Sequence, residues 1–139
     1  MMETGTHDEI MQMLCNALEQ QRRSVKAYEL MLAAAPAVQD RKLLAAMQRE
    51  ERRHYYLLEG IYEEQSGRAY RPERLQLSLP KQYVAMLQVM IRDKLDTIDY
   101  YEQLDQALTC VKQRELMTII ISDQKEQARI LATVYQRNV

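Results

Sequence analysis

The sequence predicts an all-α protein, a four-helix bundle in which two antiparallel helical hairpins are joined by one long crossover. Apolar residues recur every three or four positions over almost the whole chain, which is the period of an amphipathic helix. The 139 residues include only 3 Gly and 3 Pro, too few for the many tight turns of a β-sandwich or barrel. The length and the 47% of hydrophobic residues are typical of one globular domain.

The first hairpin is predicted from two helices, over about residues 8–34 and 37–65. Each segment carries a single apolar stripe at helical spacing. Pro36 marks the break between them, because proline is favoured in the first turn of a new helix. Gly67 stands where a C-terminal cap is expected. Residues 1–7 are polar, and we expect them to form a flexible tail.

The second hairpin is predicted from helices over about residues 81–108 and 110–136, with Thr109 as the cap of the last helix. Residues 66–80 separate the hairpins, lack a helical period and contain two prolines. A helix of this length spans about 40 Å, and a linker of about 15 extended residues reaches about 50 Å. The linker is therefore long enough to run the full length of the bundle as a crossover.

The two predicted hairpins align with each other at an offset of 73 residues without gaps. The helix joints coincide, since Pro36 falls on Thr109. Eight identical pairs support the alignment: Met13 with Met86, Leu14 with Leu87, Tyr28 with Tyr101, Glu29 with Glu102, Arg41 with Arg114, Leu43 with Leu116, Leu58 with Leu131 and Tyr62 with Tyr135. The pattern indicates an internal repeat, a duplicated helical hairpin, although amphipathic similarity alone can supply part of it.

The apolar stripes are interrupted by polar residues halfway along each helix. These inward positions are Gln21, Glu51, His54, Lys94, Gln124 and Gln127. The offset of 73 residues pairs Gln21 with Lys94, Glu51 with Gln124 and His54 with Gln127, so we expect all six at one level of the bundle. Burying a polar group costs free energy unless it finds a partner. Since neither Glu51 nor Lys94 is tolerated alone in a core, we expect these two charges to pair across the bundle.

Several segments resemble the rubrerythrin-type domains of the ferritin-like superfamily. The segments that carry the resemblance are residues 47–58, with the Glu-x-x-His motif of Glu51 and His54, residues 123–131, and the stretches that end at Glu29 and Glu102. The resemblance covers residues 8–137 and implies a single ferritin-like bundle. It also implies a site for two metal ions, usually iron, held by one Glu from each of two helices and by Glu-x-x-His from each of the other two.

At these family ligand positions the sequence keeps only Glu51 and His54. Gln21 and Lys94 stand at the two single-Glu positions, and Gln124 and Gln127 replace the second Glu-x-x-His. We therefore expect a degenerate di-iron site with no cofactor. The alternative is iron or another divalent metal ion at a residual site on Glu51 and His54. Three further acids lie close to the expected ligand positions, and a small change of alignment would involve them: Asp96, Asp123 and Glu126.

The function that follows is a structural or protein-interaction module, a homodimer or a partner of another protein, and whether the protein is an enzyme stays open. The alternative is a metal-binding oxidoreductase of the rubrerythrin or ferroxidase type. A net charge of -1 disfavours a nucleic-acid binder, and no apolar run is long enough for a membrane span. The N-terminus lacks the apolar region of a signal peptide, so we expect a cytoplasmic protein. Two cysteines without a Cys-x-x-Cys pair exclude a zinc ribbon.

Overall fold

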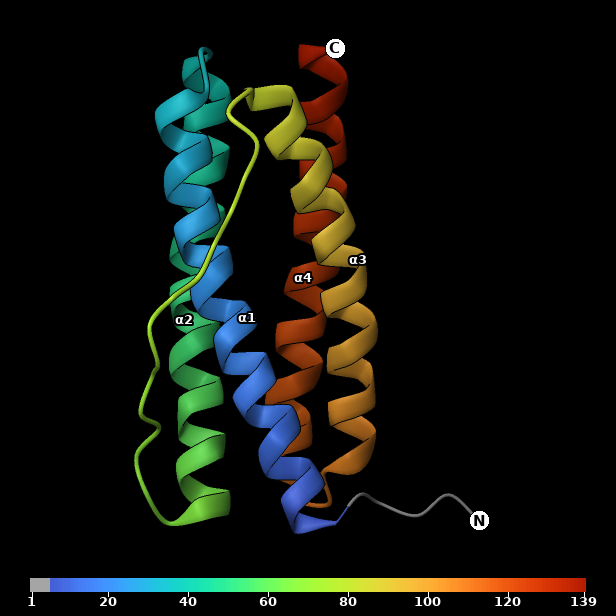
Figure 1. Cartoon of the computed structure of the whole chain (residues 1–139). Coiled ribbons are helices and arrows are strands. Elements are labelled where there is room, and N and C mark those ends of the chain that lie inside the picture. The colour runs from blue at the N-terminus through green and yellow to red at the C-terminus, as the bar shows by residue number, and fades with distance from the viewer. Residues whose placement is uncertain (1–5) are drawn as a thin grey trace.

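The computed structural model describes residues 6–139, and in that part of the chain all regular structure is helical (Figure 1). The four helices are α1 (His7–Ala34), α2 (Val38–Ser66), α3 (Tyr83–Ala107) and α4 (Val111–Asn138). None of them is both long enough and apolar enough to cross a membrane. The predicted all-α class is confirmed, and the helix bounds agree with the predicted ones to within two residues.

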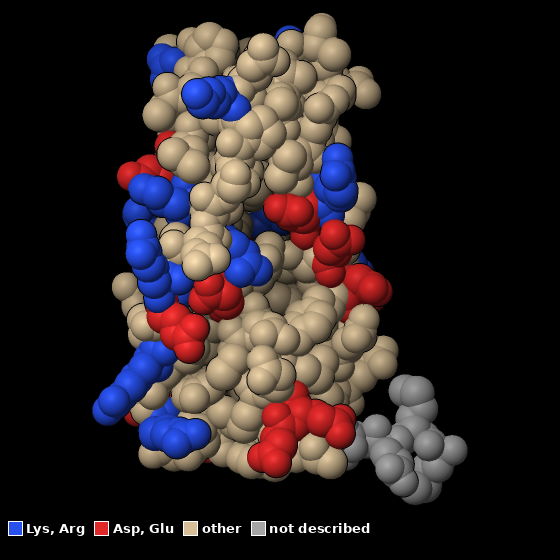
Figure 2. All heavy atoms as spheres, in the orientation of Figure 1, with Lys and Arg blue, Asp and Glu red and all other residues tan. Residues whose placement is uncertain are grey.

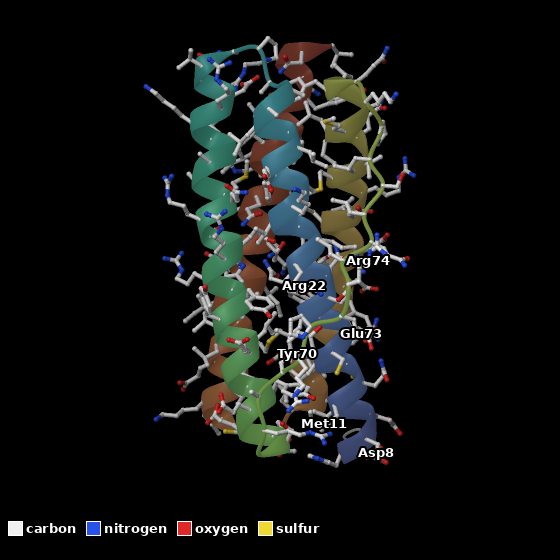
Figure 3. All side chains as sticks on the ribbon, turned by 60° about the vertical axis from the view of Figure 1, so that its left-hand side comes forward. Asp8, Met11, Arg22, Tyr70, Glu73 and Arg74 are labelled. Atoms are coloured by element: carbon white, nitrogen blue, oxygen red, sulfur yellow. The ribbon has the colours of Figure 1, made fainter. Side chains whose placement is uncertain are left out.

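Two antiparallel hairpins, α1–α2 and α3–α4, make up the bundle, and residues 67–82 cross from one to the other along its length (Figure 1). The predicted topology with one long crossover is therefore confirmed. Helix α1 also packs against α3, and α2 against α4. Tyr70 holds the crossover on the bundle, because its ring lies edge-on to Tyr62, 5.4 Å between centroids, and to Tyr55, at 6.5 Å. Figure 3 shows Tyr70 where the crossover passes over the lower part of the bundle.

Local chemistry explains where α1 begins and where α2 ends. The Thr6 hydroxyl caps α1 by accepting a hydrogen bond from the Glu9 amide at 3.2 Å. Gly67 ends α2 as predicted, with φ 74°, a left-handed conformation that glycine adopts without steric cost. Two expectations for the joints were wrong. Pro36 lies in the joint before α2 and not in the first turn of that helix. Cys110 is the N-cap residue of α4, so Thr109 lies one residue too early for its side chain to cap the helix.

We predicted a flexible tail over residues 1–7. Residues 1–5 lie outside the described residues, Thr6 caps α1, and His7 is the first residue of that helix. The charged groups that Figure 2 shows on one face are of both signs and lie close together. Such mixing is typical of solvated helix faces.

The core consists of two apolar clusters, one toward each end of the bundle. One is centred on Leu14, Leu58 and Met117 and the other on Tyr28, Leu44 and Leu131, all with no exposed surface. The polar residues of the stripes lie between these clusters. Apolar packing above and below thus fixes the position of a polar layer that is closed to solvent.

Some contacts recur at the offset of 73 residues that the sequence alignment gives. At one end of the bundle, Asn138 donates to the Asp40 carboxylate at 2.9 Å. At the other end, Gln65 donates to Gln113 at 2.8 Å, and these two residues are the counterparts of Asn138 and Asp40. The two joints, residues 35–37 and 108–110, obey the same offset. Descent from a duplicated hairpin remains a prediction.

Candidate functional site

The polar layer contains one side chain from α1, one from α3 and two each from α2 and α4. All six side chains of this layer, Gln21, Glu51, His54, Lys94, Gln124 and Gln127, are at most 2% exposed. The structure thus brings together every residue that the sequence placed at this level. No buried side-chain nitrogen or oxygen within residues 6–139 lacks a hydrogen-bond partner.

Glu51 of α2 is the centre of this layer, because both of its carboxylate oxygens accept hydrogen bonds from other helices. Its Oε2 accepts from Lys94 Nζ at 2.9 Å and from Gln21 Nε2 at 2.5 Å. Its Oε1 accepts from Gln124 Nε2 at 2.6 Å and from Gln127 Nε2 at 2.9 Å. Four donors from three helices therefore surround a single carboxylate, which leaves its oxygens little capacity for another ligand.

Lys94 supplies the balancing charge, as the sequence predicts. Besides Glu51, its ammonium group donates to Gln124 Oε1 at 2.7 Å and to Ser24 Oγ at 3.2 Å. The three protons of the ammonium therefore meet three acceptors, and the nitrogen also lies 5.3 Å from the centre of the Tyr28 ring, within the range of a cation–π contact. This arrangement suits a charged lysine paired with a charged glutamate.

The electrostatics of the pair follow from its burial. Burial raises the pKa of Glu51, but the Lys94 ammonium and His54 outweigh it and hold that pKa below the usual 4.5. Burial lowers the pKa of Lys94, while the Glu51 carboxylate opposes this effect. Each charge thus depends on its partner, because an isolated ion in this core would be strongly disfavoured.

Two buried tyrosines fix the orientation of the amides. Tyr28 donates to Gln127 Oε1 at 2.7 Å, and Tyr101 donates to Gln21 Oε1 at 2.8 Å. With their oxygens engaged in this way, both amides present an NH₂ group to Glu51. Burial, together with the nearby Glu51 carboxylate, raises the pKa of both tyrosines well above 10.0, so they act as donors.

His54 of α2 connects the layer to Asp123 of α4. Its Nδ1 lies 3.2 Å from Glu51 Oε1 and 3.2 Å from Gln124 Nε2, and its Nε2 lies 2.8 Å from Asp123 Oδ2. Burial lowers the pKa of His54, but Glu51 and Asp123 outweigh this effect and raise it above 6.5. An imidazolium here would donate to both carboxylates.

Two acids lie beside the layer that the sequence did not assign to a site, Glu50 and Asp123. Together with His54 they offer three ligand atoms within 4.8 Å of one another. A signal for them existed, because each directly precedes an inward residue, Glu51 or Gln124, and the two correspond at the offset of 73 residues. The other acids considered at this level, Asp96 and Glu126, are exposed.

Comparison with solved structures supports the fold assignment. A two-domain protein from Anabaena variabilis with DJ-1/ThiJ/PfpI-like and ferritin-like domains matches 97% of this chain with a TM-score of 0.75 and 20% identity, and the chain covers 38% of that protein. A hypothetical protein from Pyrococcus furiosus gives a TM-score of 0.81 at 13% identity, with 91% of this chain and 88% of that chain covered.

A conserved hypothetical protein from Mycobacterium tuberculosis also has a TM-score of 0.81 at 13% identity, over 94% of both chains. No protein-family model matches the sequence, and a search of the curated proteins gave no match. Identities this low carry information about the fold and not about activity. The chain therefore has a four-helix bundle fold of the ferritin-like kind.

Proposed function

We propose that this protein is a rubrerythrin-related bundle that has lost the di-iron site and acts as a structural or protein-interaction module, with a second copy or another protein as its partner. One observation carries the proposal. The Lys94 ammonium lies in the centre of the polar layer, 2.9 Å from Glu51 Oε2 and 2.7 Å from Gln124 Oε1. A cation of the chain itself thus neutralises the carboxylate at the level where the family binds metal.

The residues of the layer do not fit a di-metal centre. Such a centre uses four carboxylates and two imidazoles. Here the six positions offer one carboxylate, one imidazole, three amides and one ammonium. Two divalent ions beside Lys94 would add positive charge that Glu51 alone cannot balance, and uncompensated buried charge costs several kcal/mol or more.

The alternative, an oxidoreductase with a modified iron site on Glu51 and His54, has weaker support. Both oxygens of Glu51 already accept hydrogen bonds from the layer, two each from amides or the ammonium. An ion bound to Glu51 would have to displace at least one of these donors and approach Lys94.

Loading with iron tests the proposal. Untagged protein incubated aerobically with ferrous iron and then desalted should retain fewer than two irons per chain and show no absorption band of a bridged ferric pair. A restored variant with Gln21→Glu, Lys94→Glu, Gln124→Glu and Gln127→His is the positive control, because it has the complete ligand set. Two irons per chain in the unchanged protein, by elemental analysis, would overturn the proposal.

A further inference from the structure

We propose that Glu50, His54 and Asp123 form a site for one divalent transition-metal ion between α2 and α4. Their ligand atoms lie within 4.8 Å of one another, and they come from two helices that only tertiary packing brings together. The site shares His54 with the polar layer but does not use Glu51 as a ligand. It is therefore compatible with the Lys94–Glu51 pair.

Helix α2 places two of the three ligands next to each other. Glu50 and His54 are four residues apart, so their side chains lie on the same face of the helix, one turn apart. Asp123 of α4 faces them, with Oδ2 2.8 Å from His54 Nε2. A metal ion at Nε2 would take the place of the ring proton that otherwise bridges to Asp123, and the half-buried Glu50 would supply the third ligand atom.

Neighbouring side chains orient these ligands from outside the site. Glu51 Oε1 lies 3.2 Å from His54 Nδ1 and can accept its N–H, which leaves the Nε2 lone pair directed at Asp123. Gln127 Nε2 donates to Glu50 Oε1 at 2.8 Å. Metal-bound histidines commonly donate their second ring N–H to a carboxylate in this manner, and this contact fixes the tautomer.

The charges and the ligand types specify the ion. Two carboxylates and a neutral imidazole balance one divalent cation, while Glu51 and Lys94 balance each other. A mixed set of one nitrogen and two oxygens suits Zn²⁺, Co²⁺, Mn²⁺ or Fe²⁺. Asp123 is 27% exposed, so an ion can reach it from solvent. Within residues 6–139, the one ion pair of Glu50 is a long one of 3.8 Å to the exposed Arg53.

Zinc binding to the untagged full chain tests the site. Equilibrium dialysis against Zn²⁺ should give one ion per chain, and Co²⁺ should produce a visible d–d absorption band. Both Asp123→Asn and Glu50→Gln should weaken Zn²⁺ binding at least tenfold, and the Zn²⁺-induced rise in Tm should disappear. Both residues are half-buried, and circular dichroism verifies that these variants fold.

Two controls separate this site from incidental binding. Glu126→Gln removes an exposed acid from the same helix, three residues after Asp123, and His7→Ala removes the other histidine; both should leave zinc affinity unchanged. Absence of zinc binding to the unchanged chain would refute the site, and so would Asp123→Asn with undiminished affinity. Failure of the proposed function gives a different result, two irons per chain whose binding survives Asp123→Asn.

Discussion

Replacing Lys94 with methionine tests whether the ion pair organises the core. Methionine keeps most of the side-chain volume but removes the charge and all three donors of the ammonium. Glu51 Oε2 then keeps only the Gln21 bond within the layer, and Gln124 Oε1 loses its donor. Breaking a buried pair by removing one partner costs about 3–5 kcal/mol, because the other charge is left stranded. That loss is a large part of the roughly 5–15 kcal/mol that stabilises a typical domain.

A double-mutant cycle by urea unfolding at pH 7, in the presence of a chelator, isolates the pair. Glu51→Gln alone should also destabilise the protein, because it strands the ammonium. The double variant should be more stable than the sum of the single changes predicts, by about 2 kcal/mol, because no charge is then unpaired.

A surface lysine provides the matched control. Lys125 forms an ion pair of 3.2 Å with Glu102, but both side chains are largely exposed. Lys125→Met should change the free energy of unfolding by no more than about 0.5 kcal/mol. A Lys94→Met variant whose free energy of unfolding changes as little as that of Lys125→Met would refute the ion pair. Additive effects of Lys94→Met and Glu51→Gln on the free energy of unfolding would also refute it.

Three further predictions concern the rest of the bundle. The buried Asp40 accepts hydrogen bonds from Asn138, Arg137 and Tyr83; although burial raises its pKa, these partners outweigh that effect and hold it below 3.8. Asp40→Asn should therefore cost about 1–3 kcal/mol at pH 7, and in urea titrations the difference should shrink as the pH falls below about 4, since Asp40 then takes up a proton more readily in the unfolded chain than in the folded one. Tyr101→Phe removes the hydroxyl that donates to Gln21 and should cost about 1–2 kcal/mol, whereas Tyr100→Phe, which removes a hydroxyl that accepts from the exposed Asn16, should have almost no effect. Gly67→Ala should destabilise the protein by about 1–2 kcal/mol, because the φ of 74° at this residue is unfavourable for alanine. Gly60→Ala within α2 should stabilise it by about 0.5–1 kcal/mol, because alanine is the better helix former. An added Cβ meets no atom within 4 Å at either glycine, so thermal unfolding of the two variants compares effects of backbone conformation alone.

The sequence by itself determined the helices, the crossover and the level of the polar layer. Helical periodicity is a local property, so the stripe of each helix identifies its inward face without knowledge of the other helices. The length of residues 66–80 was enough to predict a crossover along the bundle. The same periodicity placed the six polar residues at one level of the bundle. In each hairpin, the inward polar residues of the two helices lie at about the same distance from the joint.

Only the tertiary structure decided which polar atoms meet. Periodicity gives a residue's direction to within tens of degrees, but a hydrogen bond requires the helices to be placed to within a few tenths of an ångström. The four donors around Glu51 depend on how all four helices are placed, and the approach of Asp123 to His54 depends on how α2 and α4 rotate and slide against each other. Glu50 and Asp123 lie at the edge of their apolar stripes, where a small rotation decides whether the side chain faces solvent or the neighbouring helix. That is the physical reason why the sequence identified the polar layer but not the three-residue group beside it.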